Sequence, residues 1–153
     1  SVIFTKANSD TDGRVINAMI DDFVKENEDR CRAYTSLGQL KYLSALQFCC
    51  AVVGNSSSGI IEAPSFGLPT VNIGDRQKGR ICAESVLSCG NGAREIEAAL
   101  ARALSPEFQK IAAKAENPYE GVRTSDRIVE TIRQSLDKGI DLKKEFYDKE
   151  FRT

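Results

Sequence analysis

The chain has 153 residues, of which 41% are hydrophobic and 28% are charged, and its formal net charge is −1. This length fits one domain with a substantial core, and the near-neutral charge disfavours a general binder of nucleic acid or acidic membranes. No apolar run reaches the ~20 residues of a membrane helix, so we expect no membrane span. The sequence contains no histidine, which excludes Ser-His-Asp triads, Cys-His pairs and zincin motifs.

Strands and helices alternate along the predicted secondary structure. Short apolar runs predict strands at 2–5, 31–34, 50–54, 69–73 and 84–89. Helical periodicity predicts helices at 15–24, 40–48, 58–66, 93–104, 107–115 and 125–136. We expect Asp12 to cap the first helix, Pro64 to bend or shorten the third, and Thr124 or Ser125 to cap the last. This alternation implies βαβ units, and therefore an α/β fold with a parallel sheet covered on both faces.

The five cysteines are odd in number and form no CxxC pair. Cys49 and Cys50 adjoin an apolar run, where free cysteine behaves as a small hydrophobic residue. We therefore expect buried, reduced thiols in a reducing, cytoplasmic setting, in preference to a metal or redox role.

A serine-rich loop, residues 55–58 (the serine loop), follows the third predicted strand. Ligands of open α/β sheets bind at the carboxyl ends of strands, and a helix N-terminus with serine hydroxyls suits a phosphate or diphosphate. The alternative is a serine cluster that only caps the helix. Glu62 lies one turn after Ser58 and could accept hydrogen bonds from the vicinal hydroxyls of a ribose; alternatively, it only interacts with the helix dipole.

Two other loops follow predicted strands. Residues 74–80 (the cation loop) contain Arg76, Lys78 and Arg80, and arginine can bind phosphate oxygens through paired hydrogen bonds; a solvated charged loop is the alternative. Residues 8–14 include Asn8 and an Asp-x-Asp-Gly pattern that begins at Asp10. The pattern lacks the remaining ligand spacing of a calcium loop. We expect a polar turn there or a sugar or phosphate contact, and no metal site.

Residues 54–80 (GNSSSGIIEAPSFGLPTVNIGDRQKGR) closely resemble the signature of hydrolysing UDP-N-acetylglucosamine 2-epimerases, particularly the sialic-acid and polysialic-acid capsule branch. Residues 5–14 (TKANSDTDGR) and 144–148 (KEFYD) resemble the same branch. The resemblance implies the C-terminal lobe of a two-lobed GT-B architecture, with a Rossmann-like, doubly wound parallel sheet. Residues 1–153 would then form a single UDP-binding lobe, with 141–153 as a helical tail.

The resemblance also implies roles for individual residues. Ser56 and Ser57 would hold the diphosphate, Glu62 would bind the ribose hydroxyls, and Arg76 would contact UDP. Further UDP-site residues are Asn8, Asp10, Leu37 and Arg80, with Leu37 in the segment that corresponds to the uracil contact.

The reaction of the family eliminates UDP from UDP-N-acetylglucosamine and then adds water to the resulting glycal, which gives N-acetylmannosamine. Its acid-base groups belong to the N-terminal lobe, so the resemblance implies no catalytic residue in this chain, an inactive fragment, and no cofactor. The implied partners are the UDP-sugar, the missing N-terminal lobe and a second subunit in a full-length homodimer. The alternatives are a lobe of a GT-B glycosyltransferase and a nucleotide-binding module without catalysis.

Overall fold

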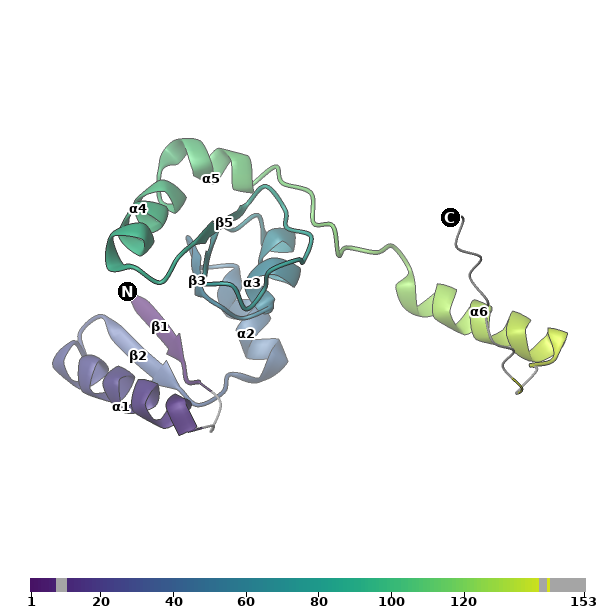
Figure 1. Ribbon diagram of the computed structural model, residues 1–153, viewed down its shortest axis with the longest axis horizontal. Coiled ribbons are helices and arrows are strands. Elements are labelled where there is room, and N and C mark those ends of the chain that lie inside the picture. The colour runs from purple at the N-terminus through teal and green to yellow at the C-terminus, as the bar shows by residue number, and fades with distance from the viewer. Residues whose placement is uncertain (8–10, 141–142, 144–153) are drawn as a thin grey trace, which may run out of the picture. The chain divides into compact units, whose positions relative to one another are not determined.

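The structure, a computed structural model, describes residues 1–7, 11–140 and 143 (Figure 1). The chain divides into two compact units, Ser1–Pro118 and Tyr119–Thr153. The strands of the first unit are β1 (Val2–Thr5), β2 (Cys31–Tyr34), β3 (Val52–Gly54), β4 (Thr70–Ile73) and β5 (Val86–Cys89). Its helices are α1 (Thr11–Glu26), α2 (Gly38–Leu46), α3 (Ser58–Ile61), the 3-10 turn η1 (Ala63–Phe66), α4 (Ala93–Ala103) and α5 (Pro106–Ala112).

All the described strand pairs are parallel. β1 pairs with β2, whereas β3, β4 and β5 form a second sheet in that order, so the described strands form three ladders in two sheets. The helices α1, α3 and α4 contact the strands beside them (Figure 1). The predicted parallel α/β class is therefore confirmed. β4 is central in its sheet, and accordingly its residues Thr70, Val71 and Asn72 are all buried.

The core of the first unit lies where α2, α3 and η1 cover β3 and β4. Leu46, Ala63 and Leu68 are buried together, and Ile60 and Val71 are fully inaccessible to solvent. The partly buried residues packed on this cluster are Tyr42, Leu43, Cys49, Val52 and Phe66. This core therefore supports α3 directly beside the carboxyl ends of the strands.

Pro64 ends the third helix early, as predicted. α3 stops at Ile61, and the chain continues as the 3-10 turn η1, with Pro64 in its first turn. Gly67 ends this turn in the left-handed conformation at φ 65°, and a Cβ there would lie 3.1 Å from Ala113 Cα. Both the backbone angle and the close approach therefore require glycine at this position.

The second unit contains α6 (Thr124–Lys138). Ile128, Ile132 and Leu136 form an apolar stripe at four-residue spacing, and each is at least half exposed. Within the described part of the chain, no helix is long and apolar enough to cross a membrane. The tail predicted at 141–153 falls outside the described residues, apart from Lys143.

Two of the predicted helix caps are wrong. α1 begins at Thr11, so Asp12 lies inside the first turn and not at the cap position. The cap position of α6 is Arg123, which adopts the left-handed conformation at φ 55° and forms no side-chain cap bond. Arg123 instead pairs with Asp126 at 2.8 Å, which fixes the first turn through charge.

The cysteine prediction is correct in part. All five thiols are free, and Cys31 is buried. Cys49 and Cys89 are partly buried, but Cys50 and Cys82 are exposed, so the expectation of buried thiols is wrong for these two. The reason is local, because β3 starts only at Val52, and Cys82 lies in the connection between β4 and β5.

Candidate functional site

The serine loop turns directly into α3. Ser57 occupies the cap position with helical backbone angles and forms no side-chain cap bond. Ser56 Oγ accepts the backbone N–H of Ser58 at 3.3 Å. The Ser56 hydroxyl can therefore still donate its own proton to a ligand. The Ser58 hydroxyl pairs across the helices with the Tyr42 hydroxyl.

The serine loop and the start of α3 are each held by a side-chain donor from a neighbouring segment. Gln77 Nε2 donates to the carbonyl of Asn55 at 2.8 Å, and Thr70 Oγ1 donates to the carbonyl of Gly59 at 2.7 Å. Gln77 belongs to the cation loop, so the first of these bonds joins the two loops that the sequence singled out. Backbone amides and hydroxyls held in this way need little reordering when a ligand binds.

A cavity of about 630 Å³ opens beside the serine loop. It brings together Leu37, which follows β2, with Ser56 and Glu62. The other lining residues come from β1 and the segment after it, from the loop after β2, and from α2, β3 and α3. They include Ile3, Thr5, Lys6, Thr35, Ser36, Tyr42, Val53 and Ser58. Three predicted UDP-site residues thus share one cavity, with an apolar group and a carboxylate among them.

Tyr42 is a wall residue of this cavity that the sequence prediction missed. Burial raises the pKa of its phenol, the nearby Glu62 charge raises it further, and the hydrogen bond with Ser58 lowers it. The phenol is therefore protonated at neutral pH and can act as a donor. The available signal was its position: Tyr42 lies four residues before Leu46, on the core-facing side of a predicted helix, where a hydroxyl needs a partner.

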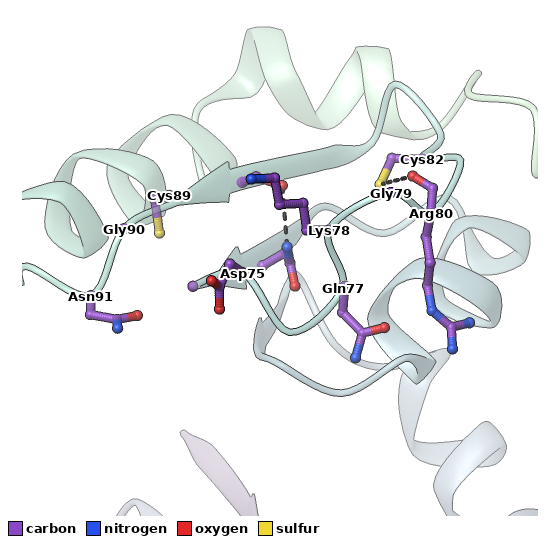
Figure 2. Close-up of a pocket in the computed structure, with 12 residues that line it drawn as sticks. Asp75, Gln77, Lys78, Gly79, Arg80, Cys82, Cys89, Gly90 and Asn91 are labelled. Atoms are coloured by element: carbon purple, nitrogen blue, oxygen red, sulfur yellow. Dashed lines mark hydrogen bonds between the residues drawn. The ribbon is translucent and has the colours of Figure 1, made fainter.

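A second cavity, of about 590 Å³, lies at the carboxyl ends of β4 and β5 and is lined by much of the cation loop (Figure 2). Arg80 and Lys78 line it, together with Asp75. Figure 2 shows Asp75 and Arg80 on opposite sides of the loop, with Gln77 between them, so these two charges lie apart. Arg80 is thus separated from the cavity that holds Ser56 and Glu62.

The remaining predicted residues are placed as follows. Arg76 is exposed, Ser57 is partly exposed, and neither lines either of the two cavities just described. Asn8 and Asp10 fall outside the described residues. Within the described ranges, no group of three or more Cys, Asp or Glu side chains gathers as a metal site.

The architecture is that of a Rossmann-like α/β lobe with parallel strands and a cavity of mixed polar and apolar lining at the carboxyl ends of β1 and β3. The sequence model of the UDP-N-acetylglucosamine 2-epimerase family matches residues 1–133. The chain therefore belongs to the UDP-N-acetylglucosamine 2-epimerase family, as its resemblance predicted.

Individual relatives agree with this membership. The chain is 35% identical over 148 residues to a GDP/UDP-N,N'-diacetylbacillosamine 2-epimerase (hydrolyzing) of Campylobacter jejuni, covering 97% of this chain and 38% of the relative. It is 33% identical over 149 residues to the polysialic acid biosynthesis protein P7 of Escherichia coli, covering 95% of this chain and 37% of that relative. The solved structure of the UDP-GlcNAc 2-epimerase of Methanocaldococcus jannaschii matches with a TM-score of 0.62 at 18% identity, covering 88% of this chain and 36% of that one. The chain thus spans under two fifths of the length of these relatives.

Proposed function

We propose that this chain is the C-terminal, UDP-binding lobe of a hydrolysing UDP-N-acetylglucosamine 2-epimerase. The observation that carries the proposal is the common cavity of Leu37, Ser56 and Glu62. It offers an apolar side chain for a base, a hydroxyl donor for phosphate and a carboxylate for sugar hydroxyls. Base, diphosphate and sugar are the three parts of a nucleoside diphosphate. Membership of the family supports the same assignment.

In this proposal each residue has a separate task. Ser56 donates its hydroxyl proton to a phosphate oxygen, while its own oxygen holds the N–H of Ser58. Glu62 accepts hydrogen bonds from the two ribose hydroxyls, and Leu37 packs on the uracil. On the resemblance alone, we also propose Ser57, Arg76 and Arg80 as UDP contacts, since none of the three lines this cavity. The bond between Gln77 and Asn55 couples the cation loop to the serine loop.

The reaction we propose for the whole enzyme is elimination of UDP from the sugar, followed by hydration to N-acetylmannosamine or a related 2-acetamido sugar. Its proton transfers require positioned titratable groups, which we assign to an N-terminal lobe absent from this chain. We further propose that residues 1–153 act as one lobe and that the whole enzyme is a homodimer. Relatives named for diacetylbacillosamine and for polysialic acid support a 2-acetamido sugar as the substrate class.

Calorimetric titration with UDP and 2′-deoxy-UDP tests the site. Glu62→Gln keeps the side-chain shape but removes the charge, so we expect roughly tenfold weaker UDP binding, in line with a hydrogen bond to a charged group. The preference for UDP over 2′-deoxy-UDP should shrink in the same variant. Glu97→Gln, on an exposed face of α4, is the matched control and should bind as the wild type does. Equal affinities of all three proteins for UDP would refute the assignment.

A product assay tests whether the reaction requires groups outside this chain. We expect this chain alone to release no N-acetylmannosamine from UDP-N-acetylglucosamine, because it contributes no group that we assign to proton transfer. Chromatography of the free sugar after long incubation provides the measurement. Turnover by the isolated chain would show that catalytic groups lie within these 153 residues.

A further inference from the structure

The hydrogen bond between Tyr42 and Ser58 joins α2 to the start of α3 at the wall of the larger cavity. Both hydroxyls line that cavity, and Glu62 lines it one helical turn further on. Tyr42 is half-buried, and its ring packs on the core formed by Leu46, Ala63 and Leu68. The phenol oxygen therefore has a fixed position, set by core packing, from which it reaches the serine loop.

The direction of this hydrogen bond decides what Ser58 can offer a ligand. A hydroxyl group has one proton and two acceptor sites, so either partner of the pair can be the donor. When the Tyr42 hydroxyl donates to the Ser58 oxygen, the proton of the Ser58 hydroxyl is not used in this bond and can point into the cavity. A phosphate oxygen next to Ser58 favours this direction, because it accepts the released proton and polarises the chain of hydroxyls.

We propose that Tyr42 is a positioning residue for the diphosphate, acting through the Ser58 hydroxyl. Tyr42 holds the Ser58 oxygen and supplies a proton to it, so that Ser58 donates to the ligand alongside Ser56. This inference rests on the proposed function, since it takes UDP as the ligand of the cavity. It adds a third hydroxyl to the two that sequence resemblance assigns to phosphate.

Removal of the phenol oxygen separates this role from the packing of the ring. Tyr42→Phe keeps the aromatic ring against Leu46 and deletes only the hydroxyl, whereas Ser58→Ala deletes the proposed mediator. Tyr34→Phe is the matched control, because Tyr34 lies on β2 and does not line the cavity. The combined Tyr42→Phe/Ser58→Ala variant completes a double-mutant cycle, which measures whether the two side chains act together.

The ligands are UDP and uridine, titrated against each variant by NMR and calorimetry. We expect Tyr42→Phe and Ser58→Ala each to weaken UDP binding by roughly three- to tenfold, the range of one hydrogen bond. Uridine carries no phosphate, so its affinity should stay the same in both variants. The combined variant should bind UDP no more weakly than Ser58→Ala alone.

Three results would overturn the inference. The first is unchanged UDP affinity in Tyr42→Phe while the wild type binds UDP, which leaves the proposed function intact. The second is an equal loss for UDP and uridine, which would mark Tyr42 as a purely structural residue. The third is an additive loss in the combined variant, which would show that Tyr42 does not act through Ser58. No UDP binding by the wild-type chain would overturn both this inference and the proposed function.

Discussion

Gly59→Ala is expected to destabilise the first unit and to displace α3. Gly59 is the second residue of α3 and is buried. A Cβ built on its backbone would lie 2.6 Å from the Thr70 methyl carbon, Cγ2. Two carbon atoms in contact lie about 3.5–4.0 Å apart, so the overlap is about 1 Å. Thr70 is only 2% exposed and has no room to retreat.

The magnitude follows from three contributions. Overpacking of this kind costs about 1–3 kcal/mol, and the bond from Thr70 Oγ1 to the Gly59 carbonyl, worth about 1 kcal/mol, is weakened when the segments separate. Alanine returns about 1 kcal/mol through its higher helix propensity. The net loss in the free energy of unfolding is about 1–3 kcal/mol, which corresponds to a fall in Tm of roughly 4–12 °C.

Urea denaturation followed by circular dichroism measures this loss, and a second substitution identifies its cause. Thr70→Ser removes Cγ2 but keeps the hydroxyl that bonds Gly59. In a Thr70→Ser background, Gly59→Ala should therefore cost less than half of what it costs in the wild type. An equal cost in both backgrounds would refute the steric argument, and a Gly59→Ala variant as stable as the wild type would refute the placement of α3 on β4.

Two further predictions concern stability. Gln109 Nε2 donates to the carbonyls of Cys50 and Ala103 at 2.8 and 2.9 Å. Gln109→Met keeps the side-chain length but loses both bonds, so it should lower the free energy of unfolding by about 1–2 kcal/mol in urea titrations. An unchanged free energy of unfolding would contradict this prediction. Because the pKa of Tyr42 is raised above its ordinary value of 10.0, the native state holds this proton more tightly than the unfolded chain. Stability should therefore fall as the pH rises above about 10, and less steeply in Tyr42→Phe, as unfolding curves between pH 8 and 11 would show. Identical slopes for both proteins would count against the raised pKa.

The order of the elements could be predicted from the sequence because each carries a local signal. Residues 52–54 are apolar and end in glycine, and Pro64 limits α3 through its own ring, so neither depends on distant contacts. The caps of α1 and α6 could not be predicted, because several adjacent polar residues compete for each cap position. At α6 the cap position falls on Arg123, whose side chain pairs with Asp126 and does not bond the helix backbone as a cap.

The candidate site was predictable where the residues adjoin one another and not where they meet only in space. Ser56 and Glu62 lie on a single motif, so their shared cavity follows from one helical turn. Tyr42 reaches Ser58 from another helix, and Gln77 reaches Asn55 across 22 positions. Such contacts depend on how α2 and the cation loop pack, which no local pattern encodes. Arg80 lines the other cavity and not the larger one for the same reason, because its position depends on how the cation loop packs.

Three of the bonds that hold the serine loop and α3 share a directional asymmetry. Gln77, Thr70 and Asn117 each donate from a side chain, while Asn55, Gly59 and Ile61 each accept through a main-chain carbonyl. Every residue type has that carbonyl, but few side chains provide the donor. In a saturation mutagenesis experiment, the donor positions should therefore accept few alternatives, whereas position 55 should be free to vary. Mutational tolerance at position 55 thus depends more on Gln77, which supplies the donor, than on the residue whose carbonyl it holds.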